Sequence, residues 1–159
     1  MYAKHTIYYD RLPHYFVAYD ILDARTGHFL GIDVVQAILA GTPAFVLPPL
    51  HVGPMASLDQ LLGLIGPSAY KSPAWRDRLA EEATSRRLDV EAVFRETDDS
   101  DLMEGLYIDV EDEGRVVERY KWVRAEFHQA IVDSETHWLR RPIIPNALAD
   151  ESCLHALHS

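Results

Sequence analysis

Two oppositely charged side chains, Glu104 and Lys121, lie in a segment whose pattern predicts a β-hairpin. The segment covers residues 101–124 and has the sequence DLMEGLYIDVEDEGRVVERYKWVR. β-branched and aromatic residues predict two strands, and Glu113-Gly114 supplies a two-residue turn in which glycine adopts a positive φ. An acid and an amine on neighbouring strands suit a ligand with an anionic group, such as a phosphate, beside a hydroxyl or a metal-bound water.

The turn sets a register for this hairpin in which Leu106 faces Lys121. In that register Glu104 and Lys121 share a largely apolar face and lie diagonally, about 7–8 Å apart. One pair is unfavourable, because Asp109 would oppose Glu118. A slip of one residue would move Glu104 and Lys121 to opposite faces of the hairpin.

Two interpretations of the charged pair remain open from this segment alone. Exposed ion pairs on hairpins are common and contribute little to stability, so the pair has a purely surface explanation. The alternative is a ligand pocket, because charged groups on an otherwise apolar face are poorly satisfied when no ligand is bound.

Composition limits the kinds of function that fit this chain. The 159 residues are 48% hydrophobic and 25% charged, as in a globular domain with its own core, and they contain no run of about 18 apolar residues that would span a membrane. The formal net charge of −10 argues against a broad nucleic-acid-binding surface. A single cysteine, Cys153, excludes an internal disulfide and a cysteine metal cluster, and a reducing cytoplasm is expected.

The expected elements mix strands and helices without regular βαβ alternation, which predicts an α+β fold with a mainly antiparallel sheet and packed helices. A buried strand is expected at 15–22 and a second strand at 44–50. Helices are expected at 32–41, after a Ser57 cap up to Gly66-Pro67, from Ser72 to about Arg87, and at 125–132. The acidic segment 96–104 predicts a solvated loop.

The sequences of the hairpin strands resemble the last two motifs of the covalent nucleotidyltransferases, which include the ATP-dependent RNA ligases. Glu104-Gly105-Leu106-Tyr107-Ile108 looks like the glutamate-glycine motif, and RYKWVR (119–124) looks like the lysine-bearing strand. YAKHTIYYDRLPHYFVAYDILDARTGHFL (2–30) and HWLRRPIIPNALA (137–149) are also similar to segments of the RNA ligase family. The resemblance implies that 1–124 is the C-terminal portion of an adenylyltransferase domain and that 125–159 is a helical tail.

The resemblance also implies roles for particular residues. Lys121 looks like the lysine that contacts the α-phosphate of ATP, and Glu104 looks like the glutamate that helps to hold the divalent metal, Mg²⁺. The aromatic strand would supply the ring that stacks on adenine, with Tyr19 as the first candidate and Phe16 as the second.

The family often carries a second basic residue two positions after the lysine, where this chain has Val123. Either Arg124 or Arg119 is expected to substitute for it at the nucleotide. His5 and Lys4, in the YAKHT segment, are placed near the site or on the surface.

The family's activity seals RNA 5′-phosphate and 3′-hydroxyl ends through AMP transfer, beginning with attack of a Lys-x-Asp-Gly lysine on ATP. This chain has three lysines, and none lies in such a motif. Three explanations are open: an earlier start of the gene product, a partner chain that carries the first half of the ligase, or a non-catalytic protein that binds nucleotide or a partner. DNA ends in place of RNA ends also remain open, since no residue is identified that reads a 2′-hydroxyl.

Overall fold

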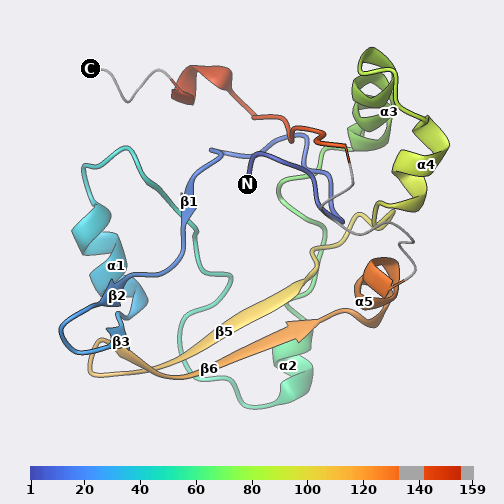
Figure 1. Ribbon diagram of the computed structural model, residues 1–159. Coiled ribbons are helices and arrows are strands. Elements are labelled where there is room, and N and C mark those ends of the chain that lie inside the picture. Colours follow the sequence, from blue (N-terminus) through green and yellow to red (C-terminus); the bar gives the residue numbers. More distant parts are fainter. Residues whose placement is uncertain (133–141, 155–159) are drawn as a thin grey trace.

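The computed structural model describes residues 1–132 and 142–154 and has the predicted α+β class (Figure 1). Its longest elements are the helix Trp75–Ser85, with 11 residues, and the hairpin strand Arg115–Val123, with 9. The helices are α1 (Ile32–Leu39), α2 (Leu58–Leu62), α3 (Trp75–Ser85), α4 (Val90–Arg95) and α5 (Ala125–Val132), with a 3₁₀ helix at Glu151–Leu154. The strands are β1 (Val17–Ala18), β2 (Leu22–Asp23), β3 (His28–Phe29), β4 (Phe45–Val46), β5 (Gly105–Asp112) and β6 (Arg115–Val123).

The described strands form three separate pairs. The pairs β5–β6 and β2–β3 are antiparallel, whereas β1 and β4 are parallel. The expectation of one buried strand over 15–22 is wrong, because the chain bends between two strands of two residues each. Phe16 and Tyr19 are 65% and 56% exposed, so their apolar rings are not the core side chains that the aromatic pattern suggested.

The main hydrophobic core lies around α3 and α4. Trp75, Leu79 and Ala83 line one face of α3 at helical spacing and pack with Tyr8, Val93 and Ile144. Helix α3 begins at Trp75, after the expected Ser72-Pro73 start. The Ser72 backbone N–H and hydroxyl instead donate to the fully buried carboxylate of Asp10, at 2.7 Å from the N–H.

Local sequence signals explain most helix ends. Gly41 has φ +76° just beyond α1, and the Ser57 hydroxyl accepts a hydrogen bond from the Gln60 N–H at 3.2 Å, as a capping residue should. Helix α2 ends at Leu62, earlier than Gly66-Pro67. Helix α4 was not expected from the sequence, and the Asp89 carboxylate caps it by accepting from the Ala92 N–H at 3.1 Å.

The acidic segment 96–104 is not a fully solvated loop, which corrects the sequence expectation. Asp98 is buried beneath the hairpin end, where it pairs with Arg124 at 2.8 Å. Asp101 accepts hydrogen bonds from the Trp75 indole and from Arg76. The segment therefore joins α3 to the end of β6 through its carboxylates.

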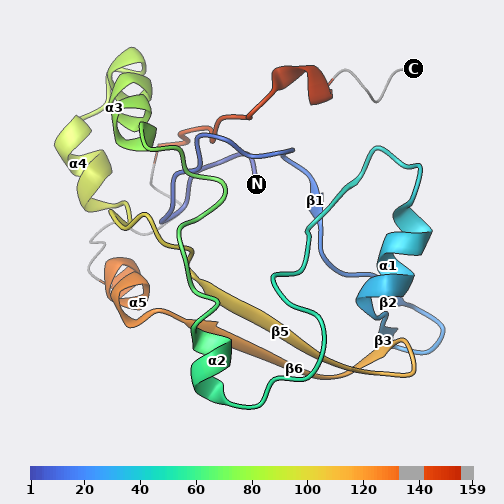
Figure 2. The same cartoon turned by 180° about the vertical axis from the view of Figure 1, so that it is seen from behind.

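Residues 142–150 run beside the N-terminal segment, and both views agree on this arrangement (Figures 1 and 2). The Lys4 N–H donates to the Ile144 carbonyl and the Asn146 N–H donates to the Tyr2 carbonyl, both at 2.7 Å. Leu12 pairs with Leu148 further along. In the described part of the chain, no helix has the length and apolar character needed to cross a membrane.

Candidate functional site

Glu104 and Lys121 meet at the end of the β5–β6 hairpin. The Lys121 Nζ lies 3.7 Å from the Glu104 Oε1, and the two side chains remain 60% and 43% exposed. Glu104 lies at the bend before β5, so the alternation of strand side chains does not fix its direction. The two charged groups therefore lie close together, as the sequence predicted.

The register that was used to predict this convergence is wrong. A β-bulge between Val110 and Glu111 shifts the pairing by one residue, so that Lys121 lies opposite Tyr107 rather than Leu106. The shift removes the expected clash of Asp109 with Glu118, because Asp109 now opposes Arg119. The turn itself is as predicted, with Glu113 and Gly114 both at positive φ.

Gly105 allows the strands to approach closely beside this pair. A Cβ added at Gly105 would lie 2.0 Å from the Trp122 carbonyl oxygen and 2.9 Å from the Val123 Cα. No other residue fits there without moving the backbone of β6. The glycine of the glutamate-glycine motif is therefore a steric requirement of the structure that holds Glu104 next to Lys121.

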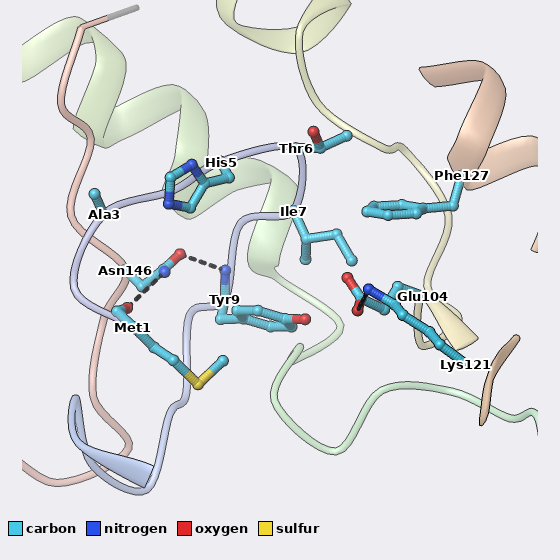
Figure 3. A pocket seen from close by; sticks show the side chains of 10 residues that line it. All are labelled: Met1, Ala3, His5, Thr6, Ile7, Tyr9, Glu104, Lys121, Phe127 and Asn146. Carbon is cyan, nitrogen blue, oxygen red and sulfur yellow. Dashed lines mark hydrogen bonds and ion pairs between the residues drawn. The ribbon is translucent and has the colours of Figure 1, made fainter. Parts of the chain in front are cut away.

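The pair opens into a cavity of about 400 Å³, within the range of small-ligand pockets (Figure 3). The N-terminal segment forms one wall, the hairpin end forms another, and α5 and the C-terminal segment complete it. The lining residues are Met1, Ala3, His5, Thr6, Ile7, Tyr9, Glu104, Lys121, Phe127 and Asn146.

The phenol ring of Tyr9 reaches toward the Glu104–Lys121 pair (Figure 3). Burial, and after it the negative charge of Glu104, raise the pKa of the Tyr9 hydroxyl well above its usual value. The hydroxyl is therefore neutral at physiological pH and keeps its proton for donation. Together the pocket presents an ammonium, a carboxylate and a phenol beside apolar surface, which suits an anionic group attached to a larger organic body.

Arg119 lies on the hairpin away from this cavity and is already paired. Its guanidinium is 2.7 Å from Asp20 and 2.8 Å from Asp109, and it stacks over the Phe29 ring at 3.9 Å. These carboxylates raise the pKa of Arg119 further, although burial acts against them as the largest single influence. Because two carboxylates surround one guanidinium, this cluster has no excess positive charge to attract a phosphate.

Arg124 is buried just after the last residue of β6. Its side chain is 5% exposed, bonds Asp98 at 2.8 Å, and donates from Nε to the Met103 carbonyl at 2.6 Å. It does not line the cavity. The structure thus brings neither of the two candidate arginines to Glu104 and Lys121.

Tyr19, the first candidate for the ring that stacks on adenine, does not line the cavity, but its ring contacts Tyr107, a residue that the sequence did not single out. The Tyr19 ring is 5.7 Å from the Tyr107 ring in an edge-to-face arrangement, and Tyr107 lies directly across the strands from Lys121. Phe16 is exposed and does not line the cavity. The position of Tyr107 in the glutamate-glycine motif was the available signal, but only the shifted register reveals that it neighbours Lys121.

The two residues of the YAKHT segment have different surroundings. His5 lines the cavity. Lys4 is buried, and its ammonium donates to the carbonyls of His5 and Glu96 at 3.0 and 3.1 Å. Phe127 and Asn146 are pocket residues that the sequence did not single out, although Asn146 lies in the 137–149 segment that resembles the family. The His155-x-x-His158 spacing lies outside the described residues.

Comparison with known families places most of the chain in a family. The family model described as RNA ligase matches residues 1–123, about three quarters of the chain. No curated protein and no solved structure matches this chain. The matched range contains the Glu104 motif, Lys121 and most of the N-terminal wall, and the chain belongs to the RNA ligase family.

Proposed function

We propose that this chain is the ATP-binding C-terminal portion of an RNA ligase adenylyltransferase, which takes part in joining RNA 5′-phosphate and 3′-hydroxyl ends. The observation that carries this proposal is the convergence of Glu104 and Lys121 on one cavity. Membership of the RNA ligase family supports the proposed reaction class. A cytoplasmic location is part of the proposal.

Lys121 is suited to receive the α-phosphate of ATP. Its nitrogen lies 3.7 Å from Glu104, which is longer than a hydrogen bond, and both groups reach solvent. Such exposed pairs are worth about 0–1 kcal/mol, so a phosphate can displace the carboxylate at little cost. The charge-assisted bond that replaces it contributes about 1.5–3 kcal/mol.

Glu104 is suited to share Mg²⁺ with the phosphates. In the described ranges no cluster of three or more potential ligand side chains occurs. Mg²⁺ in nucleotide sites is held by one or two carboxylates together with phosphate oxygens and water, so a single glutamate fits that pattern. When bound, the ion would neutralise charge on the phosphates.

Tyr19 and Tyr107 do not line the cavity, but they offer an exposed aromatic surface for the adenine ring beside Lys121. Both rings are about half exposed, and Tyr107 neighbours Lys121 across the strands. An aromatic face gives stacking energy of roughly 1–3 kcal/mol per base. Arg119, held between Asp20 and Asp109, supports Tyr107 from within 5.0 Å of its ring.

The covalent step needs an amine that these residues do not supply in a Lys-x-Asp-Gly motif. Lys4 and Lys71 are buried and donate to backbone carbonyls, and Lys121 faces Glu104. In this proposal the nucleophilic lysine comes from sequence outside the 159 residues, either upstream or on a partner chain. A non-catalytic nucleotide-binding protein is the second candidate, favoured by the absence of that motif.

Isothermal titration of ATP into the purified chain, with and without Mg²⁺, tests the proposal. Lys121→Ala is expected to weaken binding tenfold or more, since a charge-assisted bond of about 1.5–3 kcal/mol is lost. Glu104→Gln is expected to weaken binding chiefly when Mg²⁺ is present. Arg95→Ala, which removes an exposed α4 cation paired at 3.9 Å with Glu91, is the matched control and should bind like the natural chain.

Failure of the natural chain to bind ATP at millimolar concentration would refute the proposal, as would equal affinities for all four proteins. Incubation with radiolabelled ATP separates the two candidates. Labelling that appears only after addition of an upstream ligase fragment supports the ligase, and labelling of the chain alone would contradict the absence of a nucleophile.

A further inference from the structure

The pocket wall opposite the hairpin is made of irregular backbone. Six of the ten lining residues come from the first nine positions, where a single bridge residue, Ala3, is the only strand-like pairing described. A wall made of irregular backbone needs hydrogen bonds to the rest of the fold to hold a fixed shape, because loops without such bonds are mobile.

Asn146, in the C-terminal segment, makes hydrogen bonds of this kind. Its side chain is buried, its Oδ1 accepts a hydrogen bond from the Tyr9 N–H at 2.8 Å, and its Nδ2 donates to the Met1 carbonyl at 2.9 Å (Figure 3). One amide therefore ties the two ends of the wall together. The donor and acceptor on the backbone fix which amide atom lies on which side.

The backbone around Asn146 reinforces this arrangement. Its N–H donates to the Tyr2 carbonyl at 2.7 Å, and its carbonyl accepts from the Tyr15 hydroxyl at 2.9 Å. The next residue, Ala147, donates to the Tyr9 carbonyl at 2.9 Å. Residue 146 thus makes four hydrogen bonds to residues 1–15, although it lies outside the range that matches the family model.

We propose that Asn146 is a positioning residue for the nucleotide pocket. It holds Met1 and Tyr9 at a fixed separation, and it thereby sets where Tyr9 and the rest of the wall face Lys121 and Glu104. This inference rests on the proposed function, because the ligand is taken to be ATP with Mg²⁺. The C-terminal segment is then part of the binding site and more than a tail.

The test compares Asn146→Ala and Asn146→Asp with the natural chain. Asn146→Ala removes both side-chain bonds, and we expect roughly tenfold weaker binding of ATP with Mg²⁺ and roughly tenfold faster hydrogen exchange at the Tyr9 amide. The Leu79 amide in the α3 core reports global unfolding, so a larger acceleration at Tyr9 than at Leu79 identifies a local effect. Gln60→Ala and Gln60→Glu, at an exposed amide that accepts from the Ala56 N–H, are matched controls.

Asn146→Asp gives a signature that a general loss of stability would not produce. Above its pKa the new carboxylate opposes the Met1 carbonyl, whereas the protonated form donates to it as the amide does. Burial at this position and the facing Met1 carbonyl disfavour the ionised form, so they raise the pKa of the new carboxyl above the ordinary aspartate value of about 3.9. The affinity of this variant relative to the natural chain should therefore recover as the pH falls from about 8 to about 5. The other titratable groups on the cavity or bonded to residue 146 are present in both proteins, so their own titration cancels in the ratio: the Met1 α-amino group, His5, Tyr9, Tyr15, Glu104 and Lys121.

The outcomes separate the two proposals. If the natural chain does not bind ATP, the proposed function is refuted, and with it the effect of Asn146 on affinity. If the natural chain binds but Asn146→Ala binds equally well, or its Tyr9 amide exchanges no faster than in the natural chain, the positioning role is refuted while the proposed function stands. Absence of acid recovery in Asn146→Asp would likewise overturn the role.

Discussion

Replacing Arg124 by Met should destabilise the fold strongly while leaving the nucleotide pocket chemically intact. The change removes a guanidinium that pairs with Asp98 at 2.8 Å, with side chains only 5% and 4% exposed. Breaking a buried pair leaves one charge uncompensated and typically costs about 3–5 kcal/mol of unfolding free energy. Loss of the bond to the Met103 carbonyl acts in the same direction.

Urea denaturation followed by circular dichroism measures this effect. The matched control is Arg86→Met, which breaks an exposed ion pair with Glu82 one helical turn away and should cost about 0.3–0.5 kcal/mol. The double variant Asp98→Asn/Arg124→Met should recover part of the loss, because the Asp98 carboxylate is then no longer left buried without its arginine partner. Comparison of the single and double variants isolates the coupling between the two side chains.

A loss below about 1 kcal/mol in Arg124→Met would refute the reasoning, since that is the value of a solvent-exposed pair. Weaker ATP binding in a variant whose stability is unchanged would also contradict it. That second outcome would return Arg124 to the role of nucleotide ligand that its place after the lysine motif first suggested.

Two further predictions concern residues at and beside the site. Gly105→Ala should lower the free energy of unfolding by about 1–3 kcal/mol, because the added Cβ has no room beside the Trp122 carbonyl. Gly66→Ala is the control, since open space surrounds that position, and it should change the urea midpoint little. Equal midpoints for the two variants would be evidence against the close approach of the strands at Gly105. Burial lowers the pKa of Lys71 to about 8, so between pH 8 and about 10.5 the unfolded chain binds a proton that the folded chain lacks. The unfolding free energy of the natural chain relative to Lys71→Met should therefore rise with pH across that window, and a flat or falling difference in a pH series of urea melts would contradict the burial of a neutral amine.

The elements with strong local signals could be predicted from the sequence. Glu113-Gly114 marked the turn of the hairpin, and Ser57 marked the start of α2 through its own hydrogen bond. Helices α1 and α5 followed from apolar spacing. In each case the determining interaction lies within a few residues, which is the range over which sequence patterns carry information.

Features set by tertiary contacts could not be predicted in the same way. Asp98 is one of several acids in a polar segment, and only the distant Arg124 makes it a buried residue. The aromatic residues Phe16 and Tyr19 indicated a buried strand, but the chain turns too soon for one to form.

The candidate site depends both on local sequence signals and on tertiary contacts. The pairing of Glu104 with Lys121 was expected, whereas the bulge after Val110 was not, and in the shifted register Asp109 forms an ion pair with Arg119 at 2.8 Å. Asn146 lies far along the chain from Tyr9, and although the 137–149 segment resembles the family, that resemblance did not single out Asn146 as a pocket residue.

The most direct measurement of the central claim is a crystal structure of this chain grown with ATP and Mn²⁺. The account predicts that the Lys121 Nζ leaves Glu104 and lies within about 3 Å of an α-phosphate oxygen, with the anomalous peak of Mn²⁺ beside the Glu104 carboxylate. Nucleotide bound elsewhere on the chain, with Lys121 still paired to Glu104, would contradict it.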